Sequence, residues 1–355
     1  MKHMTLHIYN TFAITSIFIG VACCLLPIFL SAQAATAYYT NPVSDSIFIA
    51  DPFVLQHGGD YYLYGTSAND GFKAWKSTNL VDWQPLGYVY QRPKSSWATQ
   101  SFWAPEVVQY RERYYLIFSA KGTDPDGLRI CMAVSDSPEG PFTDWRVPLF
   151  DAGYSCIDGH LFVHQGHPYL YYEMVGVVGE PWNNKGYFKG TILGCELSDD
   201  LTQIVSDEPT ICVTATQGWE TPKDGKAISV EGMTVFALDT TLYMTYSANH
   251  YADPRYGVGF VTASHPLGPW YKSEANPILS QDTSIGVSGP GHNSIIRSPD
   301  GQELFIVYHS HADPSNPSPR RVLNIDRLLV TSDGQLRVVG PTRTPQTLPS
   351  RSNAH

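Results

Sequence analysis

One short, aromatic-rich segment recurs five times along the chain, and this repeat constrains the fold more than any other feature. The copies read YYLYGTS, YYLIFSA, YLYYE, LYMTYSA and LFIVYHS, at residues 61–67, 114–120, 169–173, 242–248 and 304–310. Short runs of aromatic and branched apolar residues are typical of β-strands. Successive copies begin about 50 to 75 residues apart, which is the spacing of a repeated structural unit.

A second strand-like segment precedes each copy across a short turn. These segments lie at residues 51–55, 105–109, 158–163, 231–236 and 292–296. Two strands joined by a short turn form a β-hairpin. A third apolar segment follows in most units, most clearly at 129–134 and 257–262. Each unit is therefore predicted to be an antiparallel meander of three or four strands.

A small meander cannot bury both of its faces alone, and repetition around an axis solves that problem. The sequence thus predicts an all-β chain folded as a five-bladed β-propeller over residues 38–340. A β-sandwich is the alternative, but it gives no reason for five copies of one unit. Residues 341–355, rich in Pro, Thr and Ser, are expected to form a tail that is held loosely or free.

The first 34 residues are typical of an export signal. An almost wholly apolar stretch spans 12–30, and Ala32-Gln33-Ala34 has the form of a cleavage site. The alternative is a transmembrane anchor, because the apolar stretch is just long enough to span a bilayer. The absence of a basic flank after it favours a cleaved signal, which predicts a secreted or periplasmic protein without a membrane span after cleavage.

Charge and cysteine content exclude some classes of partner. The formal net charge is −10 and no cluster of Lys or Arg is present, which argues against nucleic-acid binding. Beyond the signal the chain has four cysteines, Cys131, Cys156, Cys195 and Cys212, none at the spacing of a zinc site. An oxidising compartment permits disulfides among them. The sequence decides neither their pairing nor the oligomeric state.

A polar residue stands near the start of the first strand of every unit. In order these are Asp51, Glu106, Asp158, Glu231 and His292. The innermost strands of a propeller line its central channel, so four carboxyls and an imidazole are expected to converge there. Any one of them alone could be a solvated strand end or a turn cap. Five together indicate a site for acid–base catalysis or for a metal ion, because converging carboxyls cost stability.

The residues around these positions resemble the motif series of family 43 glycoside hydrolases. The motifs are ADP at 50–52, WAPEV at 103–107, IDGH at 157–160, VEG at 230–232 and GHNS at 291–294. The resemblance extends from about residue 41 to residue 339. No single motif is specific, whereas the ordered series at blade spacing is.

This resemblance implies a glycoside hydrolase of inverting mechanism. Asp51 would be the general base that activates water, Glu231 the general acid, and Asp158 the residue that orients the acid and helps it keep its proton. Inversion needs the acid and the base about 6.5–9.5 Å apart, so that a water fits between base and sugar.

The resemblance also suggests residues around the reacting groups. Trp103, Glu106 and Arg321 would contact the sugar, with blade packing as the alternative for Trp103 and a surface position for Arg321. His292 resembles a histidine that holds a calcium ion through waters, so calcium is possible although no cofactor is required. Phe72 and Trp219 could reach the pocket from loops, and His160 and His309 are expected to be structural. The thiol of Cys156, two residues before Asp158, would be either paired or sensitive to thiol reagents.

The implied substrate is an oligosaccharide of the plant cell wall. The expected activity is that of an exo-acting α-L-arabinofuranosidase or β-xylosidase, and the loop at 179–184 favours exo action if it closes one end of a cleft. Alternatives within the family are an endo-α-1,5-arabinanase and a galactose- or galactofuranose-releasing enzyme. A sugar-binding propeller without catalysis is the alternative of a different class.

Overall fold

The computed structural model describes residues 37–123, 127–176, 188–221, 227–317 and 320–351, with only the backbone described at 188, 189 and 227. Within this part of the chain every regular element is a strand apart from two short 3-10 turns, η1 (Gly218–Glu220) and η2 (Thr283–Ile285). None of these described residues forms a helix that is long and apolar enough to cross a membrane. The predicted signal at 1–34 and the loop at 179–184 lie outside the described residues.

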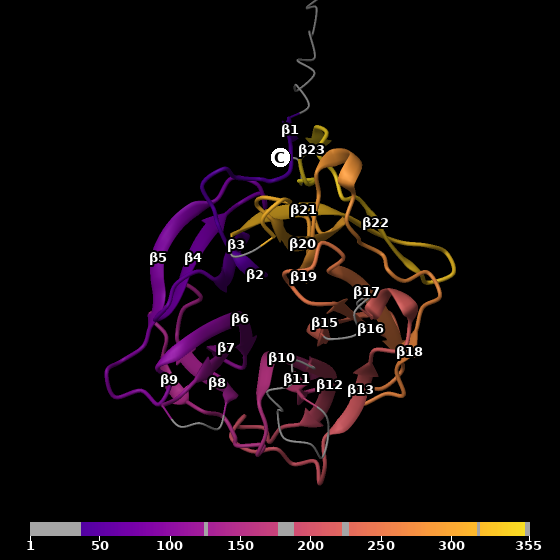
Figure 1. Ribbon diagram of the computed structural model, residues 1–355. Coiled ribbons are helices and arrows are strands. Elements are labelled where there is room, and N and C mark those ends of the chain that lie inside the picture. Colours follow the sequence, from indigo (N-terminus) through magenta and orange to yellow (C-terminus); the bar gives the residue numbers. More distant parts are fainter. Residues whose placement is uncertain (1–36, 124–126, 177–187, 222–226, 318–319, 352–355) are drawn as a thin grey trace, which may run out of the picture. The chain divides into compact units, whose positions relative to one another are not determined.

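Five antiparallel sheets form the five predicted blades (Figure 1). Blade 1 contains β2 (Ala50–His57), β3 (Asp60–Thr66), β4 (Gly71–Ser77) and β5 (Gln84–Gln91). Blade 2 contains β6 (Gln100–Tyr110), β7 (Arg113–Lys121), β8 (Leu128–Ser135) and β9 (Thr143–Arg146). Blade 3 contains β10 (Cys156–His164), β11 (His167–Val175), β12 (Phe188–Glu196) and β13 (Thr210–Thr214), and the short β14 (Ala227–Ile228) pairs with β12 in parallel.

The last two blades repeat this order. Blade 4 contains β15 (Val230–Leu238), β16 (Thr241–Ala248), β17 (Gly257–Ala263) and β18 (Tyr271–Lys272). Blade 5 contains β19 (Gly291–Arg297), β20 (Leu304–His311), β21 (Arg321–Val330) and β22 (Leu336–Val339). The first strands β2, β6, β10, β15 and β19 surround the centre in Figure 1, and β19 packs against β2 to close the ring.

The apolar core lies between the blades. Each recurring aromatic strand turns its side chains toward a neighbouring blade, which gives five inter-blade clusters. In the cluster between blades 1 and 2, the rings of Phe72, Tyr90, Phe102 and Phe118 lie with centroids 5.1–6.3 Å apart. Phe72 is fully buried there, so the expectation that it reaches the pocket is wrong. Burial of large aromatic surfaces is the main stabilising contribution of such clusters.

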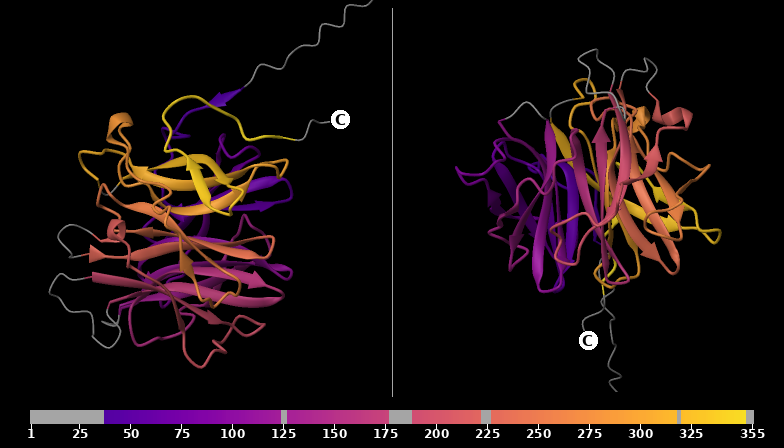
Figure 2. Two further views of the ribbon diagram at one scale, coloured as in Figure 1. Left: turned by 90° about the vertical axis from the view of Figure 1, so that its right-hand side faces the viewer. Right: turned by 90° about the horizontal axis from the view of Figure 1, so that it is seen from below.

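The two ends of the described chain fasten blade 5 to blade 1. The backbone N–H of Ile49 donates to the carbonyl oxygen of Arg321, and β1 (Tyr38–Tyr39) pairs with β23 (Gln346–Thr347). These segments lie together at one edge of the propeller in both views of Figure 2. The segment after Gly340 is thus held to the blades as far as it is described: the Arg327 guanidinium donates to Thr347, and the Ser350 N–H donates to Glu303.

Candidate active site

A β-bulge near the start of each first strand positions the central side chains. The pairing of the first two strands shifts by one or more residues at this point in all five blades. The bulged residue has a positive φ in each case: Asp51 (53°), Ala104 (44°), Asp158 (58°), Gly232 (55°) and His292 (45°). Left-handed backbone is unfavourable for residues other than glycine, and bulges typically redirect side chains next to active sites. Three strained residues therefore present two carboxyls and an imidazole at equivalent positions.

The five polar residues do not all occupy equivalent positions relative to the bulges. Asp51, Asp158 and His292 are equivalent, but Glu231 comes one residue before the bulge of blade 4 and Glu106 two residues after the bulge of blade 2. A one-residue bulge leaves no trace in the sequence, so the motifs could not show these offsets.

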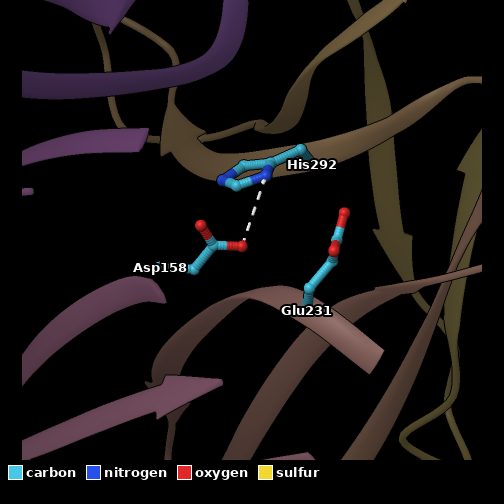
Figure 3. A group of neighbouring side chains, drawn as sticks. All are labelled: Asp158, Glu231 and His292. Atoms are coloured by element: carbon cyan, nitrogen blue, oxygen red, sulfur yellow. Dashed lines mark ion pairs between the residues drawn. The ribbon is translucent and has the colours of Figure 1, made fainter. Parts of the chain in front are cut away.

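Asp158, Glu231 and His292 converge from three different blades (Figure 3). One ligand-type atom of each lies within 4.8 Å of the others. The His292 Nδ1 atom is 3.8 Å from Asp158 Oδ2 and 3.4 Å from Asp51 Oδ1, so the imidazole stands between the two aspartates. The carboxylates nearby raise the pKa of His292 above its usual value although burial opposes the shift. The centre of the propeller thus contains the three residues predicted to be catalytic.

Asp51 is surrounded by groups that favour its anionic form. Its Oδ2 accepts a hydrogen bond of 2.6 Å from Thr66, and its Oδ1 lies 3.5 Å from the Arg321 Nη1 atom. Burial raises the pKa of Asp51, but His292 and Arg321 together with the Thr66 hydroxyl outweigh burial and hold the pKa well below its usual range. Asp51 is therefore a carboxylate at any neutral or mildly acidic pH, as a general base must be.

His309 is a neutral ring that contacts the backbone of Asp51. The backbone N–H of Asp51 donates to His309 Nδ1 at 3.1 Å, so this nitrogen carries no proton. Burial lowers the pKa of His309 well below its usual value, and the nearby Arg321 adds to the effect. His309 is fully buried and stacks on Tyr256, with ring centroids 5.7 Å apart. This environment fits the expected structural role of His309.

Asp158 has the opposite electrostatic environment to Asp51. Burial, with Glu231 and Asp51 nearby, raises the pKa of Asp158 to about 7, against the lowering effect of His292 and of the Gly232 N–H. Its Oδ2 accepts the hydrogen bond from that N–H, and its own N–H donates to Ser119. Asp158 can therefore hold a proton close to neutral pH while Asp51 cannot.

Glu231 is held by two hydroxyl groups that the sequence analysis did not find. Tyr256 donates to Oε1 at 2.7 Å, and Ser229 lies 3.1 Å from Oε2. Tyr256 belongs to the loop between β16 and β17, where no pattern in the sequence indicates that it returns to the centre. Ser229 stands just before the VEG motif. Its nearness to Glu231 in the sequence was the one signal that could have indicated a contact with this carboxyl.

The remaining predicted residues occupy distinct places. Glu106 Oε2 lies 2.6 Å from His160 Nδ1, and His160 Nε2 accepts the N–H of Val235, so this pair forms a second layer away from the bulges. Trp103 is 40% exposed and is not core packing of the blade. Arg321 faces Asp51 instead of lying on the surface. The Trp219 ring lies 5.9 Å from the Tyr246 ring at a tilt of 34° and packs on the core of blades 3 and 4.

The grouping of Asp158, Glu231 and His292 offers few of the ligands that a directly bound calcium ion needs. Calcium takes about six to eight oxygen ligands, whereas this group offers two carboxyls and an imidazole nitrogen. Both carboxyls already accept hydrogen bonds, from Gly232 N–H and from Tyr256. These residues do not fit direct calcium coordination, and a calcium ion held through waters near His292 stays a prediction.

A five-bladed propeller with such a cluster of carboxyls in opposite protonation states belongs to the class of carboxylate-dependent glycoside hydrolases. Comparison with known proteins identifies the family. The family model "Glycosyl hydrolases family 43" matches residues 39–336, and the chain belongs to this family.

Several relatives have known names or structures. A β-D-galactofuranosidase of Aspergillus niger is 28% identical over 85% of each chain. An extracellular exo-α-(1→5)-L-arabinofuranosidase of Streptomyces avermitilis is 26% identical over 83% of this chain and 62% of its own length. The crystal structure of a thermostable family-43 glycoside hydrolase matches 89% of this chain and all of its own, at 46% identity and a TM-score of 0.82.

Proposed function

We propose that the protein is a secreted or periplasmic, inverting, exo-acting hydrolase that releases L-arabinofuranose or xylose from plant cell-wall oligosaccharides. The observation that carries this proposal is the convergence of Asp51, held as a carboxylate, with a second carboxyl, Glu231, beside Asp158 and His292 at the centre of the propeller. Inverting hydrolysis needs one anionic base and one acid that retains its proton.

The proposed reaction is a single displacement. Asp51 removes a proton from a water molecule whose oxygen attacks the anomeric carbon. The bond from that carbon to the leaving oxygen breaks as Glu231 transfers its proton to this oxygen. Asp158, tied to the neighbouring Gly232 N–H, keeps Glu231 in place, and the negative charge of its carboxylate form favours the protonated form of the acid.

Substrate recognition is proposed for Trp103 and Arg321. Trp103 stands exposed on β6 next to the bulge of blade 2 and offers an aromatic wall for a sugar ring. Arg321 holds Asp51 and has an Nε atom without a hydrogen-bond partner among the described residues, which a sugar hydroxyl could fill. The names of the two relatives above support furanosides as the class of substrate.

Secretion rests on two observations. The predicted signal at 1–34 is one, and the relative from Streptomyces avermitilis, whose name includes the word extracellular, is the other. Cleavage after Ala34 would be seen as a mature N-terminus at Ala35 in the culture medium or periplasm.

The test is nitrophenol release from the α-L-arabinofuranoside, the β-xyloside and the β-galactofuranoside. Wild type is compared with Asp51→Asn and with Asp136→Asn, a control at an exposed aspartate of blade 2. We expect turnover of the arabinofuranoside or the xyloside that disappears only in Asp51→Asn, and a first product of inverted anomeric configuration by NMR. Cleavage of the galactofuranoside alone would replace the proposed sugar.

Three other outcomes would change the proposal further. Release of oligosaccharides from arabinan without nitrophenol release would indicate an endo-acting enzyme. Binding of these sugars without any cleavage would indicate a sugar-binding propeller. Activity retained in Asp51→Asn would show that the base lies elsewhere.

A further inference from the structure

Glu173 breaks a structural pattern that the other four blades share. In each blade, one residue of the second strand pairs with the first strand just before the bulge. In chain order these residues are Thr66, Ser119, Glu173, Ser247 and His309. In four blades this side chain accepts the N–H of the bulged residue in the next blade, namely Ala104, Asp158, His292 or Asp51. These hydrogen bonds tie each blade to the next one.

Blade 3 forms this tie without Glu173. The bulged residue of blade 4, Gly232, donates instead to Asp158. The Glu173 carboxyl is directed to the Ser229 hydroxyl, with its Oε1 2.7 Å from Ser229 Oγ. Glu173 is completely buried, and Gly190 beside it leaves the necessary space, because a Cβ atom there would lie only 1.8 Å from the carboxyl. The Glu173 carboxyl thus does not make the inter-blade hydrogen bond that its counterparts make.

Ser229 connects Glu173 to the proposed general acid. Its Oγ atom is 2.7 Å from Glu173 Oε1 and 3.1 Å from Glu231 Oε2. A hydroxyl has one hydrogen to donate. The Ser229 hydroxyl can therefore donate fully to only one of the two carboxyls. The second carboxyl forms a hydrogen bond with Ser229 only when it carries a proton and donates this proton to Ser229 Oγ. Both contacts can be full hydrogen bonds only when this pair of acids holds at least one proton.

The surroundings favour a proton on Glu173, in addition to the one that Glu231 holds as the proposed general acid. Burial raises the pKa of Glu173 well above its usual value, and the nearby carboxyls of Glu231 and Asp158 add to this shift. Glu231 has a second donor in Tyr256 and lies close to His292, whereas Glu173 Oε2 has no hydrogen-bond partner among the described residues. An anion at Glu173 would be buried with one solvating hydroxyl.

We propose that Glu173 is a positioning residue that acts as an uncharged carboxylic acid: it donates to Ser229, which in turn donates to Glu231 and fixes the orientation of that carboxyl. The inference rests on the proposed role of Glu231 as general acid. Tyr256 and Ser229 then hold the two oxygens of Glu231 from opposite sides, and a misplaced acid costs rate chiefly where the leaving group needs a proton.

The test compares Glu173→Gln, Glu173→Leu and Ser229→Ala on an oligosaccharide and on a nitrophenyl glycoside. The Gln amide N–H can replace the donated proton, so kcat on both substrates should stay within about threefold of wild type. Glu173→Leu should lower kcat on the oligosaccharide by about 10- to 100-fold and change the nitrophenyl reaction by less than about threefold. Ser229→Ala should show the same selectivity, and the double variant should lose little more.

Asp326→Asn serves as the matched control. Asp326 is another buried carboxyl, bound to Tyr308 and Thr342 in blade 5, so its loss affects folding without reaching Glu231. It should lower thermal stability with no difference between the two substrates. Equal losses on both substrates in Glu173→Leu, in proportion to lost stability, would overturn the proposal. Loss in Glu173→Gln as large as in Glu173→Leu would overturn the uncharged role.

Infrared spectroscopy tests the protonation without any turnover. At pH 7, the carbonyl-stretch region of protonated carboxylic acids should contain, in wild type and in Glu231→Gln, a band that is lost in Glu173→Gln and is separate from the signal of Asp158. Absence of this band in wild type would overturn the proposal. If wild type cleaves no glycoside but shows the band, the proposed function fails while the protonated state of Glu173 stands.

Discussion

The backbone N–H of Gly232 donates a 3.1 Å hydrogen bond to Oδ2 of Asp158, which ties the central carboxyl of blade 3 to the residue after Glu231. Gly232 has a φ of 55°, and a Cβ atom at this position would lie 2.9 Å from the His292 ring. Backbone geometry that suits glycine therefore brings Asp158, Glu231 and His292 together.

Because of its raised pKa, Asp158 should destabilise the protein as the pH rises. The folded state holds the Asp158 proton up to about pH 7, whereas an unfolded chain releases it near 3.8, the usual pKa of an aspartate. The folded state thus binds more protons between these values, and stability falls with rising pH across that window. A shift of this kind corresponds to about 1.4 kcal/mol per pH unit.

Asp158→Asn should remove this penalty. We expect its Tm to exceed that of wild type by roughly 2 °C or more at pH 8 and to match it at pH 4, measured by calorimetry. Activity should fall in the same variant, because the group that positions Glu231 is changed. A Tm advantage at pH 4 equal to that at pH 8 would show that the effect is one of packing and not of charge.

Arg321→Met should shift the acidic limb of the kcat/KM profile to higher pH. Arg321 is one of the cations that hold the pKa of Asp51 low, so its removal makes the anion less favourable and raises that pKa. The base then loses activity at a higher pH than in wild type. The measurement is the pH profile on the best nitrophenyl glycoside, with Arg320→Met as the neighbouring exposed control. An unchanged acidic limb with a raised KM would assign Arg321 to sugar binding alone.

Glu231→Gln should distinguish substrates by leaving group. Natural oligosaccharides need protonation of the leaving oxygen, so their kcat should fall by about 10²- to 10⁴-fold, whereas nitrophenyl glycosides should be largely spared. Steady-state kinetics on both classes is the measurement. Equal losses on the two classes would argue that Glu231 has another role.

The repeat in the sequence was sufficient to predict the five blades, because each aromatic strand carries its inter-blade packing locally. The site was predicted less completely. Asp51, Asp158 and His292 occupy equivalent bulges, but the bulges themselves depend on pairing between strands and separate Glu231 and Glu106 from that register. Tyr256 comes from a loop whose path depends on tertiary packing.

Glu173 did leave a signal in the sequence. When the five repeats are aligned on their aromatic strands, Glu173 stands where the others have Thr66, Ser119, Ser247 and His309. A carboxyl among small hydrogen-bonding side chains marks an exception in blade 3. Its connection to Glu231 through Ser229 could not be read from that alignment, because it depends on how blades 3 and 4 meet.

The four cysteines of the propeller should resist thiol reagents in the folded protein. All four are free and buried, and Cys156 packs into the core between blades 2 and 3 although it lies two residues from Asp158. Burial raises the pKa of Cys156, Cys195 and Cys212 to about 12 and that of Cys131 well above its usual value, so the reactive thiolate is scarce at neutral pH.

Treatment of the native protein with iodoacetamide at pH 7.5 should leave these four positions unmodified and activity unchanged, as read by peptide mass mapping. All four should be labelled in denaturant. Ser315→Cys, at an exposed loop position, supplies the positive control for labelling of the folded state. Fast labelling of Cys156 under native conditions with parallel loss of activity would show that blades 2 and 3 open beside the site.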